Sequence, residues 1–182
     1  MKFILTRHTT TDWNSTGRIQ GQTDIPLSLQ GKTEAGQLAK LLSGLGINLI
    51  VSSDLKRASE TAEIANALLA VPLQLERRLR ECSFGKVEGL PKQQAVEQYG
   101  SLMAPNWEDQ HHAYDFRPFG GEHRDGVLAR HIEALKSLAS EKPDSTILLV
   151  GHGRGLSTLL AGLGQLSDLK RGEYRIIEYN SR

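Results

Sequence analysis

Two histidines and two arginines lie close to points where short apolar runs of the chain end. Arg7 and His8 follow one run, His152 follows another, and Arg57 comes about one helical turn after a third. Cationic side chains brought to one place repel each other unless an anion lies among them. Guanidinium groups match the oxygens of a phosphoryl group in a two-pronged fashion. If the fold brings these residues together, their types predict a phosphate site.

The same residues have simpler roles when each is taken alone. A histidine after a strand is more often a hydrogen-bonded structural residue than a nucleophile. Arg57 suits a solvated position on an amphipathic helix, Arg7 suits an ion pair, and Glu81 suits an ordinary surface charge. The phosphate prediction therefore depends on the convergence of the set and not on any single member.

Glycines on both sides of His152 add a second signal. Gly151 and Gly153 allow a tight turn between a strand and a helix, and the N-terminus of a helix favours anions. The turn resembles a nucleophile elbow with histidine in place of serine, so an α/β-hydrolase is excluded. Leu156 stands where a dinucleotide fingerprint needs its third glycine, and no P-loop pattern is present. A nucleotide cofactor is therefore not expected.

The elements that would position these residues alternate along the chain. Short apolar or alternating runs predict strands at 3–5, 47–51, 73–75, 146–150 and 174–178. Helical periodicity predicts helices from the cap Ser28 to 42, from the cap Asp54 to 69, over 123–139 and over 156–163. This alternation predicts an α/β fold, a three-layer α/β/α sandwich with a mostly parallel sheet. Ligands of such sheets bind at the carboxyl ends of the strands.

One stretch, 77–122, has poor periodicity and contains scattered Gly, Pro, His and Trp. A long irregular stretch in a compact domain is usually a lid or a binding loop, unless it hides helices. The chain has no internal repeat, no low-complexity tract and no linker rich in Pro, Gly and Ser. We expect a single domain over 1–182 with a lid or insert at about 77–122.

Composition limits the classes of partner. The chain has 182 residues and a formal net charge of +1, with 22 Lys+Arg and 21 Asp+Glu. Such a balance gives no overall field suited to nucleic acid or to an anionic membrane, so neither partner is expected. Cys82 is the single cysteine, which excludes an internal disulfide and a cysteine-cluster metal site and favours a reducing compartment. The apolar run before Arg7 is too short for a signal segment or a span, so we expect a cytoplasmic location.

Several motifs resemble those of the histidine phosphatase superfamily, also called the phosphoglycerate mutase-like group. The matching segments run through most of the chain and are 7–9, 11–14, 21–27 with Gly31, 53–62, 79–89, 118–122 and 151–152. Thr9 stands where the family usually has glycine. Threonine here, together with Gly-Gln-Thr-Asp-Ile-Pro-Leu at 21–27, is similar to the α-ribazole phosphatase and broad-specificity branch.

The resemblance implies a phosphoglycerate mutase-like fold and a reaction in two displacements. His8 would accept the phosphoryl group, and Glu81 would protonate the leaving group and later activate water. Other residues implied in catalysis are Arg7, Arg57 and His152. The implied substrate-binding residues are Asn14, Gln20, Gly21, Thr9 and Gly153. The substrate would be a small phosphorylated metabolite, and no metal or cofactor would be needed, because fixed cationic side chains replace a divalent ion.

Three alternatives stay open. A phosphoglycerate mutase would return the phosphoryl group to the substrate, but mutases follow the acidic residue with Arg-His-Tyr, and this chain has Cys-Ser-Phe at 82–84. A non-catalytic phosphate-binding module would keep the fold without the reaction. A metal-dependent hydrolase would draw on Asp109, His111, His112 and Asp115, which lack a recognisable ligand spacing. The physiological ester and the oligomeric state, monomer or homodimer, cannot be read from the sequence.

Overall fold

Five strands form one sheet in the computed structural model, which describes residues 1–108, 113–165 and 169–179. The strands are β1 (Lys2–Arg7), β2 (Leu49–Ser52), β3 (Leu73–Leu75), β4 (Thr146–Gly151) and β5 (Tyr174–Glu178). Their order across the sheet is β3-β2-β4-β1-β5. Only β5 among them runs antiparallel to its neighbour, β1. The predicted mostly parallel sheet is confirmed.

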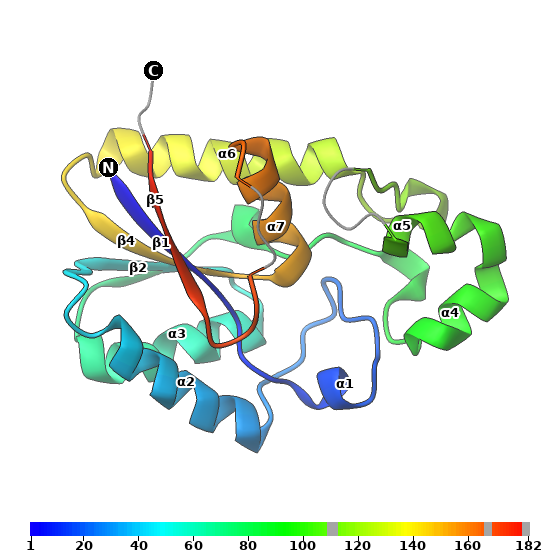
Figure 1. Ribbon diagram of the computed structural model, residues 1–182, viewed down its shortest axis with the longest axis horizontal. Helices are drawn as coiled ribbons and strands as arrows, with labels where there is room; N and C mark the ends of the chain where they lie inside the picture. The colour runs from blue at the N-terminus through cyan, green and yellow to red at the C-terminus, as the bar shows by residue number, and fades with distance from the viewer. Residues whose placement is uncertain (109–112, 166–168, 180–182) are drawn as a thin grey trace.

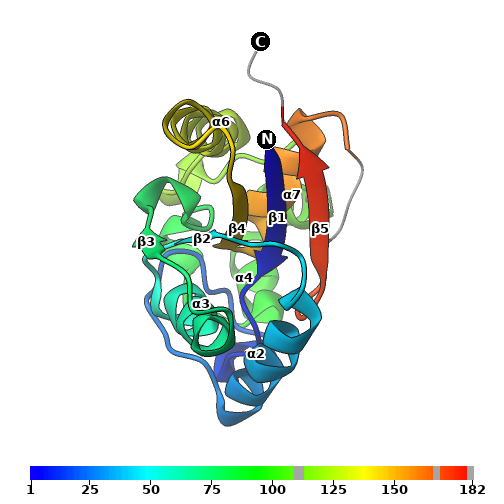
Figure 2. The same ribbon diagram turned by 90° about the vertical axis from the view of Figure 1, so that its left-hand side faces the viewer.

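Helices cover both faces of the sheet. One face is covered by α2 (Leu29–Leu42) and α3 (Lys56–Leu69), and the other by α6 (Arg124–Glu141) and α7 (Gly153–Gly162). Figures 1 and 2 show the sheet between these two helical layers. The predicted three-layer α/β/α sandwich is therefore confirmed. None of the described helices is long and apolar enough to cross a membrane.

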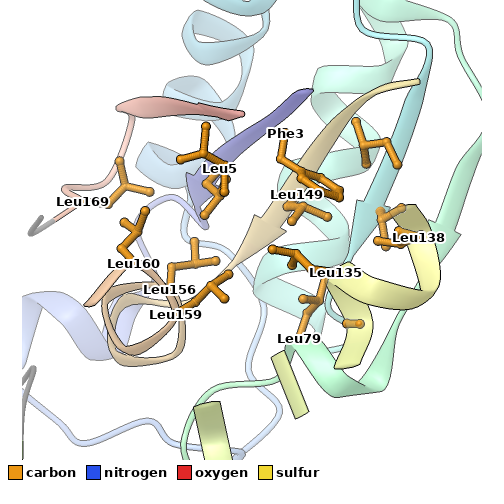
Figure 3. Packing of buried hydrophobic residues seen from close by; sticks show 14 of the residues in the cluster. Phe3, Leu5, Leu79, Leu135, Leu138, Leu149, Leu156, Leu159, Leu160 and Leu169 are labelled. Atoms are coloured by element: carbon orange, nitrogen blue, oxygen red, sulfur yellow. The ribbon is translucent and has the colours of Figure 1, made fainter. Parts of the chain in front are cut away.

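The central strands bury side chains on both faces, which explains their continuous apolar runs. Phe3 and Leu5 of β1 pack in the cluster under α6 and α7, together with Leu135 and Leu156 (Figure 3). Ile4, which points to the opposite face, packs in the cluster under α2 and α3. Successive side chains of a strand alternate between faces, so a strand covered on both sides is apolar throughout.

Two helix starts differ from the sequence prediction. Asp54 does not cap α3, whose N-cap residue is Leu55, because the Asp54 carboxylate instead binds both Nε and Nη2 of Arg80, each at 2.7 Å. The last helix begins at Gly153, so α7 starts before the predicted position 156 and His152 is its N-cap residue. The predicted cap Ser28 is confirmed, since its Oγ accepts from the amide of Gly31.

The stretch 77–122 is more regular than its sequence indicated. It contains η1 (Arg77–Leu79), η2 (Gly85–Val87), α4 (Lys92–Tyr99), η3 (Gly100–Leu102), α5 (Ala104–Glu108) and η4 (Arg117–Phe119). A further short helix, α1 (Asp12–Ser15), also went unpredicted. These helices are short, so they present too few turns for a periodic pattern. Most of the stretch lies beside the sheet, as α4 and α5 do in Figure 1, around a separate core that includes Cys82, Met103 and Phe116.

The start of α2 packs closely on the loop that follows β1. The hydroxyl of Thr9 donates to the carbonyl of Gly31 at 2.8 Å, and the amide of Ser28 donates to the carbonyl of Thr10 at 3.0 Å. A Cβ atom at Gly31 would overlap the Thr10 carbonyl. Glycine at this position therefore lets the helix hold the loop that carries His8.

We expect Gly31→Ala to lower the free energy of unfolding by about 1–3 kcal/mol, because a backbone carbonyl must move to make room. Gly36→Ala is the matched control, since it lies in the same helix and its Cβ would meet no heavy atom within 4 Å outside the local helix backbone. The control gains up to about 1 kcal/mol from helix propensity. Urea unfolding measures both, and equal effects at the two glycines would contradict the packing argument.

Candidate active site

The carboxyl ends of β1, β2 and β4 meet at one edge of the sheet. Arg7 of β1 is paired with Gly151 of β4. The next residue, His8, donates its amide to the carbonyl of Gly151 at 2.9 Å, and Ser53 donates its amide to the carbonyl of Val150 at 2.9 Å. The parallel register therefore places the polar residues after all three strands side by side, as the sequence predicted.

His8 presents a neutral imidazole to the other histidine. Its ring centroid lies 5.3 Å from that of His152, and its side chain is buried. The Nδ1 atom lies 2.7 Å from the carbonyl of Thr9, which can only accept, so Nδ1 carries the proton. Burial, followed by the charges of Arg57 and Arg7, lowers the pKa of His8 well below its usual value. Nε2 is therefore left with a lone pair, as a nucleophile requires.

His152 has the opposite arrangement of its two nitrogen atoms. Its Nε2 lies 2.8 Å from Oγ of Ser53, and that Oγ accepts from the amide of Leu55 at 3.3 Å. The Ser53 hydroxyl has no other acceptor within the described residues, so it donates to Nε2, and the ring proton lies on Nδ1. The Nδ1 atom is buried and has no hydrogen-bond partner within the described residues. Burial, followed by Arg57 and His8, lowers the pKa of His152 well below its usual value.

Arg57 is a buried cation, with an exposed fraction of 1%. Its Nη1 donates to the carbonyl of Thr23 at 2.9 Å and its Nη2 to the carbonyl of Gly21 at 2.6 Å. Burial lowers its pKa to about 10, so the guanidinium stays charged at neutral pH. Its Nε is buried and finds no acceptor in the described part of the chain. An unsatisfied buried donor costs about 1–3 kcal/mol, which an oxygen-rich ligand would relieve.

Glu81 lies against the first turn of α7. Its Oε1 accepts from the amides of Cys82 at 2.9 Å and Gly155 at 2.8 Å, and its Oε2 accepts from the amide of Arg154 at 3.1 Å. The side chain is buried, yet it lines the pocket that His8 also lines. These three N–H groups fix the orientation of the carboxyl group relative to the histidines.

Arg130 of α6 holds the segment that carries Glu81, and sequence reasoning did not single it out. Its guanidinium donates to Glu122 through Nε and Nη2, each at 3.0 Å. The same guanidinium donates to the backbone carbonyls of Arg78, Arg80 and Glu81. Glu122 also accepts from the amide of Ser83 at 2.8 Å. One sequence signal could have revealed this network. The Gly-Gly-Glu segment that ends at Glu122 matched a motif of the family, but no role was assigned to it.

The pocket at this edge has a volume of about 330 Å³, which suits a small phosphorylated molecule. Most of the residues predicted from the sequence line it, namely Arg7, His8, Asn14, Gln20, Gly21, Arg57, Glu81 and Gly153. Its wall and rim also include residues that the sequence did not indicate, among them Trp13, Arg18, Lys92, Arg154 and Arg171. The structure therefore brings Arg7, His8, Arg57 and Glu81 into one cavity, whereas His152 is fully buried behind His8 and is not among the described residues that line it.

Thr9 is the predicted binding residue that the structure places elsewhere. It is not among the described residues that line the pocket. Its hydroxyl donates to the carbonyl of Gly31, and its amide donates to Oγ1 of Thr61 at 3.2 Å. Its backbone has no positive φ, which among the described non-glycine residues occurs only at Ala70. A side chain is therefore tolerated where the family has glycine, because it points to α2 and α3 and not to the pocket.

The metal alternative has no support among the described residues. Asp109, His111 and His112 lie outside them. Asp115 accepts hydrogen bonds from Nε and Nη2 of Arg117 at 2.8 and 2.7 Å. The described residues hold no cluster of three or more His, Cys, Asp or Glu side chains suited to a metal ion.

Comparison with known proteins relates the whole chain to one family. Residues 3–180 match the family model of the histidine phosphatase superfamily (branch 1). "Uncharacterized phosphatase PhoE" of Bacillus subtilis is 34% identical over 156 residues, which make up 86% of this chain and 74% of that protein. "Probable phosphoglycerate mutase GpmB" of Salmonella paratyphi A is 34% identical over 163 residues, or 88% of this chain and 74% of that protein.

A solved structure extends this likeness to the fold. The mycobacterial glucosyl-3-phosphoglycerate phosphatase, solved in complex with VO3, superposes with a TM-score of 0.86 at 29% identity. The superposition covers 97% of this chain and 90% of that chain. The three-layer sandwich is therefore shared with a phosphatase of known structure.

Three buried histidines make the stability of the protein depend on pH. Burial is the first cause that lowers the pKa of His8, His152 and His131, the last to about 3 with a contribution from Arg130. The unfolded chain binds protons at these side chains near pH 6.5, whereas the folded chain does not. The free energy of unfolding therefore rises with pH up to about 6.5 and falls below it, by about 1.4 kcal/mol per pH unit for each neutral histidine.

His131→Gln tests this, because His131 is buried in α6 and does not line the pocket. We expect the dependence of the unfolding free energy on pH, measured between pH 5 and 6.5, to become shallower by about 1 kcal/mol per pH unit than in the wild type, because an unfolded histidine is only half protonated at pH 6.5. Urea unfolding in buffers free of phosphate measures it. An unchanged slope would mean that His131 is already charged in the folded protein.

Proposed function

Since the chain belongs to the histidine phosphatase superfamily, we propose that it hydrolyses a small phosphomonoester through a phosphohistidine at His8. Its fold is of the phosphoglycerate mutase-like type, and relatives of the chain are named phosphatases. The observation that carries the proposal is the neutral His8, whose Nε2 has a lone pair, beside two buried N–H groups of Arg57 and His152 that lack acceptors within the described residues. Phosphoryl oxygens are the acceptors that this arrangement needs.

In the first step, Nε2 of His8 attacks phosphorus in line with the ester oxygen. The P–N bond forms, the P–O bond breaks, and Glu81 gives its proton to the departing alkoxide. The bond from Nδ1–H of His8 to the Thr9 carbonyl stabilises the charge that develops on the imidazole. Arg7, Arg57 and His152 offset the charge on the three equatorial oxygens.

In the second step, water attacks the phosphorus of phospho-His8. The Glu81 carboxylate removes a proton from that water, the P–N bond breaks, and its electron pair returns to Nε2. Inorganic phosphate leaves, and Glu81 is protonated again for the next cycle. The proposal needs no metal, because fixed cationic side chains replace the divalent ion.

The substrate in this proposal is a small phosphorylated metabolite. The pocket has room for one, and a relative from Mycobacterium tuberculosis is named glucosyl-3-phosphoglycerate phosphatase. The alternative is a mutase, and the similarity to the relative named GpmB favours it. Against it, the positions where mutases carry Arg-His-Tyr hold Cys82, Ser83 and Phe84, and two of these three are buried in the core beside the sheet. Hydrolysis is therefore the better-supported reaction.

The first test is release of phosphate from p-nitrophenyl phosphate in excess EDTA. We expect His8→Ala to abolish release, because no other side chain replaces the nucleophile. Glu81→Gln should lower kcat on an alkyl phosphate by roughly 10²- to 10⁴-fold, the usual contribution of a general acid. It should lower the first-turnover release of p-nitrophenol far less, because that leaving group departs without a proton, whereas hydrolysis of phospho-His8 still needs the Glu81 carboxylate.

The three alternative functions predict different results in these assays. Loss of activity on adding EDTA, with the protein still folded, would indicate a metal-dependent hydrolase. Transfer of the phosphoryl group between positions of a phosphoglycerate, without release of phosphate, would indicate a mutase. Phosphate binding without turnover of any ester would indicate a non-catalytic module.

Arg130→Met tests the network that positions Glu81. We expect kcat on an alkyl phosphate to fall by about 10- to 100-fold with little change in KM, because a small displacement of the acid disrupts proton transfer. The loss in first-turnover release of p-nitrophenol should be smaller, because that leaving group needs no proton. Lys136→Met, an exposed change on the same helix, is the control. Equal losses of the first-turnover rate with the two esters would mean that Arg130 does not act through proton donation by Glu81.

A further inference from the structure

Glu88 joins two segments that lie on different sides of the site. Its Oε1 accepts from the amides of Gln22 at 3.1 Å and Phe84 at 2.9 Å, and its Oε2 accepts from the hydroxyl of Thr23 at 2.9 Å. Gln22 and Thr23 belong to the loop after α1, whereas Phe84 lies three residues after Glu81. One carboxylate therefore connects segments that are far apart in the chain.

The first segment, residues 20–23, contains the carbonyls that bind Arg57, and we call it the Arg57 loop. The carbonyls of Gly21 and Thr23 accept from the two terminal nitrogens of this guanidinium group at 2.6 and 2.9 Å. Burial is the main cause that lowers the pKa of Arg57, and nearby carboxylates, among them Glu88, act in the opposite direction. Glu88 therefore supports the loop through hydrogen bonds and also favours the charged form of Arg57.

Glu88 packs closely on this loop. Gly21 has a φ of +53°, and a Cβ atom there would overlap the Glu88 carboxyl group. The backbone on the carboxyl side of Glu88 is also bound to the loop, because the amide of Gly89 donates to the carbonyl of Ile19 at 2.8 Å. The amide of Ile19 in turn donates to the carbonyl of Leu90 at 2.9 Å. The carboxylate thus has a fixed position relative to the loop.

The second segment, residues 81–84, begins with the proposed proton donor, and we call it the Glu81 segment. The loop contacts this segment at a second point, since Nε2 of Gln22 donates to the carbonyl of Glu81 at 3.1 Å and to Oε2 of Glu122 at 3.3 Å. Glu88 itself is not among the described residues that line the pocket. Any effect of Glu88 on the reaction must therefore pass through the residues that it holds.

Resting on the proposed hydrolysis at His8, we propose that Glu88 is a positioning residue that makes the Arg57 loop and the Glu81 segment move as one unit. Without its hydrogen bonds, the phosphate-binding cation and the acid would shift independently of each other. A misplacement of roughly 1 Å can slow a reaction by about 10²-fold. Glu88 therefore affects both binding and proton transfer, whereas Arg130 contacts the acid segment but not the Arg57 loop.

Amide hydrogen exchange of the ligand-free protein tests the coupling without any reaction. In Glu88→Ala we expect exchange to rise by about tenfold or more at Gln22 and Phe84, because both amides lose a charged acceptor. Exchange should also rise at Gly155, whose amide donates to Glu81 at 2.8 Å, because the acid becomes mobile when its segment is released.

Glu60→Ala is the matched control. Glu60 is half-buried, like Glu88, and accepts from the amide of Leu27 at 2.9 Å, but it accepts from no described amide of the Glu81 segment. Its removal should raise exchange at Leu27 and leave Gly155 unchanged. Glu88→Gln keeps the shape of the side chain and one carbonyl oxygen, so it should cause smaller changes of the same kind. It keeps the test valid if Glu88→Ala fails to fold.

Kinetics separate this coupling from a general loss of stability. Glu88→Ala should raise KM for an alkyl phosphate and lower kcat, each by about tenfold, whereas Arg130→Met should change KM little. In the first turnover, the loss with the alkyl phosphate should exceed the loss in release of p-nitrophenol, because only the former leaving group needs the acid.

Two results would overturn the proposal while leaving hydrolysis at His8 untouched. One is wild-type exchange at Gly155 in the folded Glu88 variants, and the other is an unchanged KM or equal first-turnover losses with the two esters in Glu88→Ala. If the wild type hydrolyses no ester, the proposed function fails. The exchange at Gly155 then shows by itself whether Glu88 couples the two segments.

Discussion

The buried guanidinium of Arg57 is the constraint on which the rest of the site depends. Removing such an ion from water costs several kcal/mol, so it must be compensated by fixed acceptors. The carbonyls of Gly21 and Thr23 provide two of these, and in doing so they hold the loop that bounds the pocket. Together with burial, the charge of Arg57 keeps His8 and His152 neutral. The hydrogen bonds of this cation thus explain the ordering of the loop, and burial together with its charge explains an uncharged imidazole in the place where the proposed reaction needs a nucleophile.

The sheet fixes the relative positions of the charged and neutral side chains of the site. Because β1 and β4 are neighbours in register, the residues after them are fixed by backbone hydrogen bonds that no side-chain change removes. The N-terminus of α7 adds the amides of Arg154 and Gly155, which orient Glu81. Arg130 then joins this segment to α6 through Glu122. The acid and the histidines are therefore positioned by separate elements that meet only at the pocket.

The sequence predicted best the features that depend on local pattern. Strands buried on both faces gave continuous apolar runs, and the polar residues after them were correctly expected to share one edge. Asp54 was misread as a helix cap because nothing local reveals that Arg80, far along the chain, binds its carboxylate. Arg130 was missed because an arginine on a helix has the same pattern whether it is solvated or holds backbone carbonyls. The helices within 77–122 were missed because each is too short to show periodicity.

This division between the sheet edge and the stretch 77–122 has a consequence for specificity. Arg7 and His8, which line the pocket, are held by the sheet, whereas Phe84 and Lys92 come from the stretch beside it. Phe84 packs in a core separate from the clusters that cover the sheet, so changes there leave the strand register intact. Substrate choice can therefore change by substitution at such positions without disturbing the arrangement of Arg57 and the two histidines. The residues at the sheet edge and these residues of the neighbouring stretch can therefore vary independently.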